Sequence, residues 1–392
     1  MNKTLEEMAV VLSGRDYKGN PPGDKVPIYG TGGIMGYTSI PLYQGKSILS
    51  GRKGSINNPF YVEGDFWNVD TIFCIKTKEG IDTKWLYYNF LNTDLTRINE
   101  ATGVPSVSSK ALYKLKFNWL ELPEQRRIAQ ILSTTDAVIE QTQAAIAKYK
   151  AIKQGMLHDL FTRGIDITTG KLRPKQEDTP DLYKESKLGW VPKEWDVKEI
   201  DKIGDIVTGS TPPTANAEYY GNEFLFVSPA DIHGELFISD TEKKLTQSGF
   251  DLCRKLPVNT ICIVCIGSTI GKIAILRTIG CTNQQINSVV CFDSDLSFFY
   301  FYAMLCYNEQ QFGKEVGLQA VPIVNKNNFS KFILPLVEKN EALEISKRLL
   351  TIDHKLQTEQ NYLQKLQALK QGLMGDLLSG KVKVSETLIG AD

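Results

Sequence analysis

Two stretches of the chain carry a narrow hydrophobic stripe with the spacing of a coiled-coil helix. In residues 341–380, apolar side chains recur at intervals of three, four and seven residues, and the stripe consists of Leu349, Ile352, Leu356, Leu363, Leu366, Leu373 and Leu377. Residues 124–163 carry a similar stripe, which consists of Leu132, Ile139, Ile146, Tyr149 and Met156. These spacings place the side chains along one side of an α-helix. We predict two helices of roughly 40 residues, each about 60 Å long, that need a partner because one helix cannot bury its own stripe.

The two helical stretches are copies of one another. They align without a gap at a constant shift of 217 residues, which aligns Asp136 with Asp353 and the block Lys153-Gln154-Gly155 with Lys370-Gln371-Gly372. Composition alone does not explain such a register, so we infer an internal duplication. The simplest partner for each helix is its own repeat. The pattern allows either orientation, and an antiparallel pair would give the molecule approximate twofold symmetry.

Capping and turn residues mark where the long helices begin and end. Pro123 lies where the first turn of a helix tolerates proline, and Gly164 and Gly380 are typical of helix C-termini. The polar segment between the first helix and Leu188 contains Pro174 and Pro180, which is typical of a linker. The expected organisation is a globular domain (1–121), a long helix (122–163), a linker (164–188), a second globular domain (189–338), a second long helix (339–380) and a C-terminal tail (381–392).

The two globular segments show short β-rich runs between Gly and Asn residues. The predicted strands cover residues 46–50, 71–75, 260–266, 273–276 and 288–292, and helices are predicted at 85–95 and 298–312. The fold class is therefore α+β, with two mixed α/β domains separated by the two long helices of an internal pseudo-twofold repeat.

The composition is that of an ordinary globular protein, with 42% hydrophobic residues. Lys and Arg number 45, as do Asp and Glu, so the net charge of zero excludes a histone-like or polybasic mode of binding. The first globular segment has a small basic excess and the second an acidic one. A polyanion would therefore have to bind to a local cluster of Lys, Arg and amide side chains.

Three features bear on the cellular location. No apolar run approaches the roughly 20 residues of a membrane span. The first residues, Met1 to Ser13, contain Glu6 and Glu7 and lack the basic-then-apolar order of a signal peptide. The seven cysteines are an odd number and are widely spread, which favours reduced thiols. We expect a cytoplasmic protein that does not cross a membrane.

Several short motifs resemble catalytic or metal sites but lack residues that the chemistry needs. Residues 267–273 resemble a phosphate-binding loop, yet they are one residue short between the glycines and have no Ser or Thr after Lys272. Residues 57–60 (NNPF) resemble an amino-group methyltransferase signature without its first proline. Cys262 and Cys265 have the spacing of a zinc knuckle, but no second pair follows, so we interpret them as core thiols.

The histidines do not favour nucleophilic catalysis. His158 and His354 lie on the predicted long helices, so the sequence does not support a catalytic triad of Ser, His and Asp. We therefore expect no catalytic centre in this chain.

Three groups of motifs together resemble the specificity subunit of type I restriction-modification systems, over nearly the whole chain. The first group is YGTGGIMGY (29–37), followed by GRKGSI (51–56) and FWNVDT (66–71). The second is LPEQRRIA (122–129), which opens the first long helix, and the third is LGWVPKEW (188–195) before the second globular segment. The second helix departs from the family pattern because it opens with Glu338-Lys339-Asn340-Glu341, which leaves its first residue open.

The resemblance implies a division of labour within a larger complex. Two target-recognition domains would each read one half of a split sequence in double-stranded DNA, and an antiparallel pair of helices would hold them apart. Two methylation subunits would bring S-adenosylmethionine and the adenine-methylating site, and restriction subunits would cut. This chain would carry no chemistry and no cofactor of its own. Helix length would set the spacer, which is the number of base pairs between the two half-sites, as in dimeric proteins that bind two half-sites a fixed distance apart. The outer faces of the helices would dock the methylation subunits.

Candidate DNA-binding residues follow from the resemblance and from side-chain chemistry. In the first domain we favour Arg52, Lys53 and Ser55, because Arg and Lys engage guanine edges or phosphates and the flanking glycines allow close backbone approach. Thr31, Gly32, Asn68 and Asp70 are secondary choices. In the second domain the aligned set is Ser268, Thr269, Lys272, Asn283, Gln284 and Gln285, in which Asn and Gln suit adenine. Some of these residues would contact phosphates only.

A second class of function fits the repeat equally well. The chain could be a non-catalytic scaffold whose paired helices dimerise or bind partner proteins. A scaffold has no need for two globular domains that diverge in sequence while the helices stay alike. This divergence favours a DNA-recognition protein over a scaffold. A methyltransferase or nuclease fused to its own reader is excluded mainly by the missing motifs.

Overall fold

The computed structural model describes residues 2–316 and 322–384 of the chain. The fold divides into two compact units. Unit 1 consists of residues 1–145 and 360–392, and unit 2 of residues 146–359. Each unit therefore combines one predicted globular domain with one segment of each long helix. Within the described residues, no helix has both the length and the apolar character that crossing a membrane requires.

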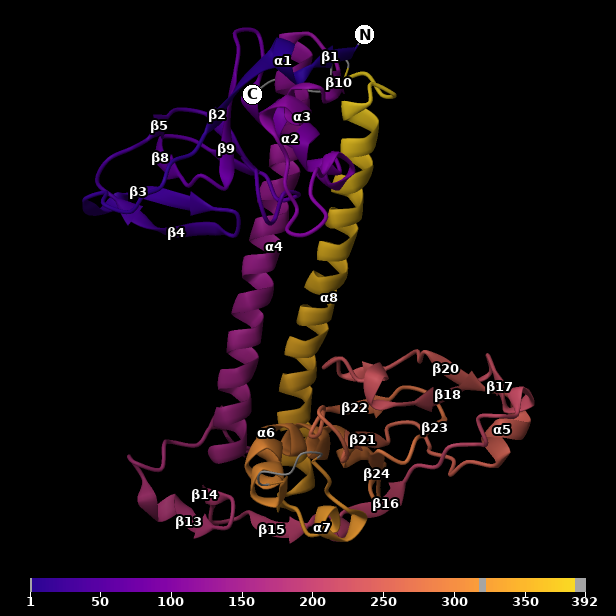
Figure 1. Ribbon diagram of the computed structural model, residues 1–392. Coiled ribbons are helices and arrows are strands. Elements are labelled where there is room, and N and C mark those ends of the chain that lie inside the picture. Colours follow the sequence, from indigo (N-terminus) through magenta and orange to yellow (C-terminus); the bar gives the residue numbers. More distant parts are fainter. Residues whose placement is uncertain (1, 317–321, 385–392) are drawn as a thin grey trace. The chain divides into compact units, whose positions relative to one another are not determined.

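Unit 1 contains a mixed domain built from short strands and three short helices (Figure 1). Its strands are β1 (Asn2–Thr4), β2 (Ala9–Ser13), β3 (Pro22–Gly30), β4 (Gly33–Thr38), β5 (Tyr43–Gln44), β6 (Ser47–Gly51), β7 (Phe60–Val62), β8 (Asp65–Asn68), β9 (Ile72–Thr77) and β10 (Lys116–Asn118). Its helices are α1 (Leu5–Met8), α2 (Thr83–Leu91) and α3 (Ser109–Tyr113), followed by the first part of α4 (Leu122–Thr162) and the last part of α8 (Lys339–Leu378). The predicted strands at 46–50 and 71–75 correspond to β6 and β9.

The domain of unit 1 is organised around two four-stranded sheets. One sheet has the order β2-β9-β6-β7 and is antiparallel throughout. The other has the order β4-β3-β8-β5, in which β3 and β8 run parallel. β3 and β4 form a hairpin whose last pair is Gly30 with Gly33, so Thr31 and Gly32 form its tip. Gly33, the residue directly after the tip, has φ of 113°, a positive-φ backbone conformation that favours glycine.

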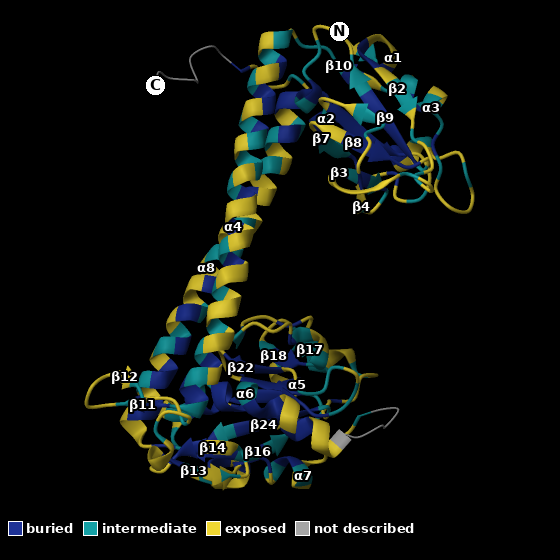
Figure 2. Cartoon of the chain, turned by 90° about the vertical axis from the view of Figure 1, so that its left-hand side faces the viewer, coloured by how far each residue is buried: buried dark blue, intermediate teal, exposed yellow. Residues whose placement is uncertain are grey.

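In unit 1, α2 packs against the beginning of α4 and the end of α8. One core joins Trp85 and Leu86 of α2 to Leu132 of α4 and Leu377 of α8. Because the start of one long helix meets the end of the other, the pair is antiparallel here. Leu132 is fully buried, and burial of a leucine side chain contributes about 1.5–3 kcal/mol. Buried and exposed positions alternate along both long helices, as a single stripe requires (Figure 2).

Unit 2 contains a larger domain of the same general kind. Its strands are β11 (Ile165–Asp166), β12 (Lys171–Leu172), β13 (Tyr183–Ser186), β14 (Gly189–Pro192), β15 (Asp196–Glu199), β16 (Gly204–Thr208), β17 (Tyr220–Gly221), β18 (Phe224–Val227), β19 (Phe237–Ile238), β20 (Lys243–Leu245), β21 (Ile261–Val264), β22 (Ile273–Leu276), β23 (Gly280–Thr282), β24 (Ile286–Cys291) and β25 (Ile333–Leu336). Its helices are α5 (Gln247–Asp251), α6 (Ser297–Val316) and α7 (Lys326–Ser330), together with the last part of α4 and the first part of α8. β21, β22, β24 and α6 correspond to the elements that the sequence predicts.

Two sheets of unit 2 resemble those of unit 1, and the first of them has one additional strand. One has the order β16-β24-β21-β22-β19, and the other has the order β17-β20-β18-β23. In the second sheet β18 and β23 run parallel, as β3 and β8 do in unit 1. α6 packs against the end of α4 and the beginning of α8, where Phe161, Phe299 and Ile345 share one core. The long helices are antiparallel in this unit as well, which confirms the α+β repeat and the helix pair.

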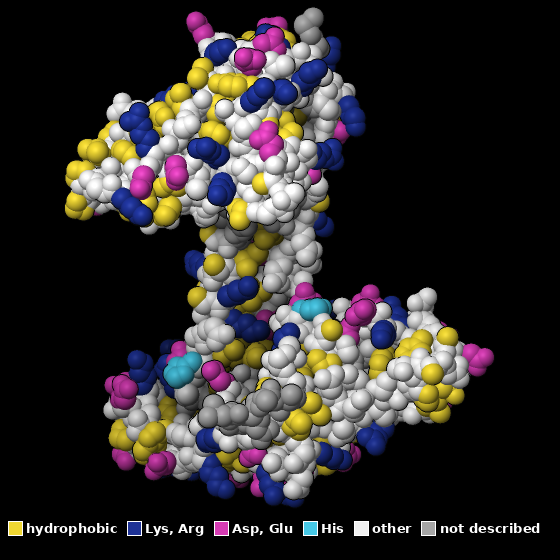
Figure 3. Space-filling view, viewed as in Figure 1, with side chains coloured by type: hydrophobic (Ala, Val, Ile, Leu, Met, Phe, Trp, Pro, Cys, Tyr) yellow, Lys and Arg dark blue, Asp and Glu magenta, His cyan; other side chains and the backbone are white. Residues whose placement is uncertain are grey.

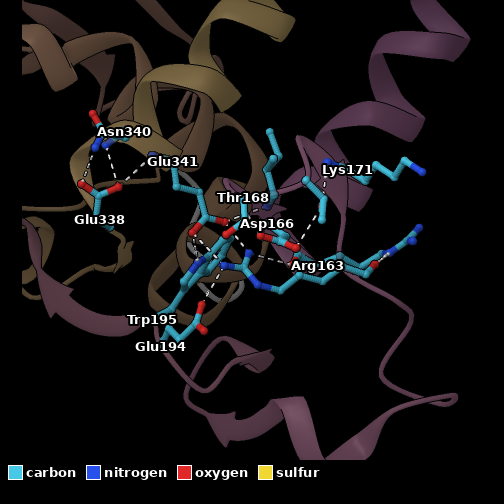
Figure 4. Close-up of polar contacts among 12 residues, drawn as sticks. Arg163, Asp166, Thr168, Lys171, Glu194, Trp195, Glu338, Asn340 and Glu341 are labelled. Atoms are coloured by element: carbon cyan, nitrogen blue, oxygen red, sulfur yellow. Dashed lines mark hydrogen bonds and ion pairs between the residues drawn. The ribbon is translucent and has the colours of Figure 1, made fainter.

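The segment 164–188 is folded, which differs from the linker that its composition indicates. β11 pairs with β12, and β13 pairs with β14. The carboxylate of Glu341 accepts hydrogen bonds from Arg173 at 2.5 Å and 3.1 Å, from the backbone N–H of Ile165 at 2.7 Å and from the indole N–H of Trp195 at 3.2 Å (Figure 4). Arg173 also pairs with Glu194 at 2.7 Å. A residue at the start of α8 therefore organises this segment.

Candidate nucleic-acid interface

The Arg52 loop of unit 1, which comprises residues 51–56, is held in place by hydrogen bonds of its backbone. The N–H groups of Arg52 and Lys53 donate to the carbonyl of Thr71 at 2.8 Å and 3.2 Å, and the N–H of Gly54 donates to Pro105 at 2.8 Å. The side chains of Arg52, Lys53 and Ser55 are exposed. The Arg52 guanidinium donates to the carbonyl of Asp70 at 3.5 Å and lies 5.7 Å from the centre of the Phe73 ring. The loop thus presents two cations on a fixed backbone.

The tip of the β3–β4 hairpin lies beside this loop. A Cβ atom on Gly54 would lie 3.6 Å from Thr31 Oγ1, which places the two turns next to each other. Gly32 and Asp70 are exposed and Thr31 is half-buried. A cleft of about 720 Å³ opens here, and its lining includes Lys18, Thr31, Gly32, Ile34, Met35 and Asp70. Six of the seven residues predicted for the first domain therefore lie on this loop, on the hairpin or on the adjacent β8–β9 turn, and Asn68 is the exception.

Ser55 closes the same loop, whereas Asn68 lies inside the domain. A Cβ atom on Gly51 would come within 2.5 Å of the Ser55 carbonyl oxygen, so the turn requires glycine at that position. Asn68 has no exposed surface, and its side-chain amide donates to the carbonyl of Ile72 at 2.9 Å. This placement contradicts the sequence prediction for Asn68. Its amide stabilises the turn that carries Asp70 and Thr71, so it supports the site without facing a ligand.

Sequence reasoning missed the apolar side chains of β4. Ile34, Met35 and Tyr37 are 52%, 56% and 49% exposed. Hydrophobic side chains gather at the end of the domain that carries β3 and β4 (Figure 3). Ile and Met are side chains that wedge between base steps or contact thymine methyl groups. Their position in a glycine-bounded hairpin was visible in the sequence and could have indicated an exposed face.

In unit 2, the predicted residues lie in two adjacent turns. Ser268, Thr269 and Lys272 belong to the β21–β22 turn, and Ser268 and Lys272 are exposed. Asn283, Gln284 and Gln285 belong to the β23–β24 turn. The N–H of Cys265 donates to the carbonyl of Gln285 at 2.8 Å, and a Cβ atom on Gly267 would lie 3.6 Å from Gln285 Nε2. The structure therefore brings the two predicted groups together.

The three amide side chains of unit 2 are not equally available. Asn283 and Gln285 bond to each other, because Asn283 Nδ2 donates to Gln285 Oε1 at 3.0 Å and the N–H of Gln285 donates to Asn283 Oδ1 at 3.0 Å. Gln284 is exposed and its Oε1 accepts from Thr211 Oγ1 at 2.5 Å. Of the three, Gln284 has the side chain best placed to meet a base edge.

A polar recess beside Gln284 was not predicted. It has a volume of about 250 Å³, and its lining includes Thr211, Thr214, Tyr220, Ser228, Lys243 and Asn283. Residues 209–214 (GSTPPT) form a turn-rich stretch after β16, and that cluster of turn residues was the available signal for a loop.

The two units anchor their loops in the same way but display different side chains. Lys53 forms an isolated bridge with Ser106, and Ile266 forms the matching bridge with Ile323. The N–H of Gly54 donates to Pro105, and the N–H of Gly267 donates to Pro322. In this correspondence the exposed Arg52 is replaced by Cys265, which is buried. The backbone frame is therefore shared, and the cations of unit 1 have no counterpart at these positions in unit 2.

The cysteines behave as core residues. Cys262 and Cys265 are buried, and burial raises the pKa of each thiol to about 12. This placement confirms their interpretation as core thiols. Within the part of the chain that the structure describes, no group of three or more His, Cys, Asp or Glu residues is arranged to hold a metal ion.

Basic and acidic side chains are interspersed on the surface. In the view of Figure 3, Lys and Arg lie among Asp and Glu on both units. This distribution agrees with the net charge of zero. Any contact with a polyanion must therefore rely on local groups such as the Arg52 loop.

Comparison with known sequences identifies the family that this chain matches. The family described as type I restriction modification DNA specificity domain matches residues 2–149 and 192–368. The HindI type I restriction enzyme specificity subunit of Haemophilus influenzae is 28% identical over 196 residues, which are 49% of this chain and 42% of that protein. The MjaVIII specificity subunit of Methanocaldococcus jannaschii is 24% identical over 357 residues, which are 86% of this chain and 76% of that protein. The chain thus spans about two fifths of the length of the first relative.

Two solved structures share the fold. A type I restriction-modification system S subunit from M. genitalium superposes with a TM-score of 0.69 at 15% identity, covering 96% of each chain. A chain from a study of complex assembly and conformational transition of the type I R-M system gives a TM-score of 0.51 at 14% identity, covering 97% of this chain and 98% of that one. At these identities the likeness concerns the fold alone.

Proposed function

The chain belongs to the family of type I restriction modification DNA specificity domains, and on this premise we propose that it selects the DNA sequence on which a type I restriction-modification complex acts. Each unit would read one half of a split target in double-stranded DNA. The chain would carry no catalytic group and no cofactor, and S-adenosylmethionine would enter with methylation subunits. It would act in the cytoplasm.

One observation carries the proposal: the same backbone frame holds different side chains in the two units. The loops at Gly54 and Gly267 are anchored by equivalent N–H groups, yet one displays Arg52 and Lys53, whereas the other displays Ser268 and lies next to the turn that displays Gln284. Arginine and lysine engage guanine, whereas glutamine engages adenine. Two readers with a common frame and different side chains suit a target whose halves differ. A scaffold would not require this divergence.

The long helices would set the distance between the two recognition domains and so the length of the DNA spacer. α4 has 41 residues and α8 has 40, so each is about 60 Å long at 1.5 Å per residue. A rigid element of fixed length between two readers measures the distance between half-sites, as dimeric DNA-binding proteins do.

The same helices offer two matching positions for methylation subunits. Ile152 on α4 is 39% exposed, and Leu369 on α8, which aligns with it at the shift of 217 residues, is 54% exposed. Equivalent exposed apolar residues on the two repeats support two docking sites, one in each unit, and restriction subunits would join the full complex. Ile152→Asp and Leu369→Asp should each reduce the number of bound methylation subunits from two to one in native mass measurements. Retention of two subunits by both variants would contradict this assignment.

The test of the specificity role is to express the methylation subunit with and without this chain and to map methylated adenines in the host genome. A split motif that requires the chain would support the proposal and identify both half-sites. If the methylation subunit copurifies with the chain but no chain-dependent motif appears, the scaffold interpretation is favoured instead. Labelled S-adenosylmethionine added to the isolated chain should not bind, and stoichiometric binding would contradict the absence of a cofactor site.

A further inference from the structure

Two clusters of three side chains connect the recognition domains to the long helices. Triad 1 consists of Tyr88, Asp136 and Lys370, all in unit 1, and triad 2 consists of Tyr302, Asp353 and Lys153, all in unit 2. The Asp and Lys members are among the identities of the internal repeat. The loops that contact DNA in the proposed function do not use them.

The geometry of the two triads is nearly the same. In triad 1 the Tyr88 hydroxyl donates to Asp136 Oδ2 at 2.7 Å, and Lys370 pairs with Asp136 Oδ1 at 2.5 Å. In triad 2 the Tyr302 hydroxyl donates to Asp353 Oδ2 at 2.6 Å, and Lys153 pairs with Asp353 Oδ1 at 2.6 Å. In both, the ammonium lies 5.7 Å from the centre of the tyrosine ring.

Each triad joins three helices. Tyr88 lies on α2 of the recognition domain, Asp136 on α4 and Lys370 on α8. In unit 2 the roles of the long helices are exchanged, because Asp353 lies on α8 and Lys153 on α4. Each carboxylate therefore binds its own domain through one oxygen and the opposite long helix through the other.

The triads supply a directional restraint that the surrounding core lacks. Apolar contacts are non-directional, so they tolerate small rotations of a domain against the helices that it packs on. A hydrogen bond weakens steeply as its angle changes. Both tyrosine rings are buried, and the Lys and Asp side chains of the triads are between 11% and 26% exposed, so water competes little with these contacts.

Orientation matters because DNA is helical. One additional base pair between the half-sites rotates one of them by about 35° about the duplex axis and moves it by about 3.4 Å. A domain that can rotate on its helices would accommodate this change, whereas a fixed domain would reject it.

We propose that the two Tyr–Asp–Lys triads are positioning elements that make the complex selective for spacer length. They fix the angle of each recognition domain on the helix pair of its own unit, while the loops select the half-site sequences. This inference rests on the proposed function, because it concerns how a split target is measured.

The test uses the full chain in complex with its methylation subunits. Methylation rates are measured on duplexes that carry the two half-sites with the native spacer and with one base pair more or fewer. Tyr88→Phe and Tyr302→Phe remove only the hydroxyl and keep the buried ring. Each variant should lower the preference for the native spacer about tenfold, the double variant should lower it further, and the half-site sequences should stay unchanged.

Tyr113→Phe is the matched control. Its hydroxyl accepts a hydrogen bond from the backbone N–H of Val11 at 2.9 Å, so this variant loses a contact inside the domain of unit 1. It should lower the melting temperature and leave the spacer preference unchanged. Lys370→Met provides a second test of triad 1, since it removes the ion pair and keeps the tyrosine hydroxyl.

The outcomes separate the two proposals. If the triad variants destabilise the fold as Tyr113→Phe does and keep the wild-type spacer preference, the positioning role is overturned. If the wild-type complex shows no split motif at all, the proposed function itself fails.

Discussion

Replacement of Glu341 by alanine should destabilise unit 2 strongly. The Glu341 side chain is 4% exposed and its carboxylate accepts four hydrogen bonds, from Ile165, from Trp195 and twice from Arg173. The Arg173 side chain is only 12% exposed. The variant would leave this guanidinium buried with Glu194 as its remaining carboxylate partner. Removal of one member of a buried ion pair costs about 3–5 kcal/mol, because the other charge is left without compensation.

The effect is large enough to measure directly. For a unit of this size, 1 kcal/mol shifts the melting temperature by about 2–4 °C, so Glu341→Ala should lower the transition of unit 2 by about 6–20 °C. Hydrogen exchange of residues 165–195 should also accelerate, since Glu341 holds both ends of that segment.

Glu344→Ala is the control on the same helix. Glu344 pairs with Arg348 at 2.9 Å, and both side chains are about one third exposed, so its loss should cost about 0.3–0.5 kcal/mol. Equal effects of Glu341→Ala and Glu344→Ala would refute the reasoning. The paired replacement of Arg173 by Met and Glu341 by Leu should recover part of the loss, because it leaves no unpaired buried charge but still deprives the N–H groups of Ile165 and Trp195 of their acceptor.

Four further predictions concern recognition, spacing, thiols and acid stability. Arg52→Ala should relax selectivity at one half-site only, as read from methylated motifs, and an equal loss of affinity for all DNA would show that Arg52 touches phosphate instead. Removal of whole heptads from both long helices should shorten the recognised spacer, and an unchanged spacer would contradict the proposal that helix length sets it. Cys262 and Cys265, with pKa values raised by burial to about 12, should resist alkylation at pH 8 until the chain is denatured, which mass spectrometry can follow; labelling of the folded chain would disprove their burial. Hydrogen bonds from Thr96 and then Asn57 lower the pKa of Asp94 to about 2, below an unfolded value of about 3.9, so the stabilisation is present above about pH 4 and disappears as the pH falls through 2. Asp94→Asn should remove that part of the acid dependence of unfolding, and an unaltered acid profile would speak against it.

Sequence patterns predicted the helices well because their signal is local. The stripe residues Leu132 and Leu349 are fully buried, and α4 and α8 end within two residues of the predicted bounds. The hydrophobic pattern alone leaves the orientation of the pair open, because heptad spacing describes one helix and not the direction of its partner.

Long-range contacts account for the predictions that failed. Residues 164–188 are polar and contain prolines, and they fold because Arg173 and Ile165 bind Glu341, which lies far along the chain. Asn68 has a polar side chain next to the exposed Asp70, yet β8 carries it into the sheet beside β3. No local pattern distinguishes an amide that serves a ligand from one that serves a turn.

In the candidate site too, local features could be predicted from the sequence, whereas long-range contacts could not. Glycine-bounded turns indicated where loops would form, and the structure places Gly54 beside Thr31 and Gln284 beside Thr211. Which loops would meet could not be predicted, because β3 and β8 pair in parallel across an intervening stretch of chain. The recess around Lys243 is lined in part by Phe226 of β18, which pairs in parallel with the distant strand β23.

The main-chain anchoring of the two loops has a consequence for how such a reader changes over evolutionary time. Because the N–H groups of Gly54 and Gly267 hold their turns through the carbonyls of Pro105 and Pro322, the neighbouring side chains contribute little to the shape of the loop. Under the proposed function, mutation of Lys53 or Ser268 would alter the preferred bases without the penalty of refolding the turn. New specificities would thus be accessible by single substitutions on an unchanged frame, and each half of the proposed target would drift independently of the other.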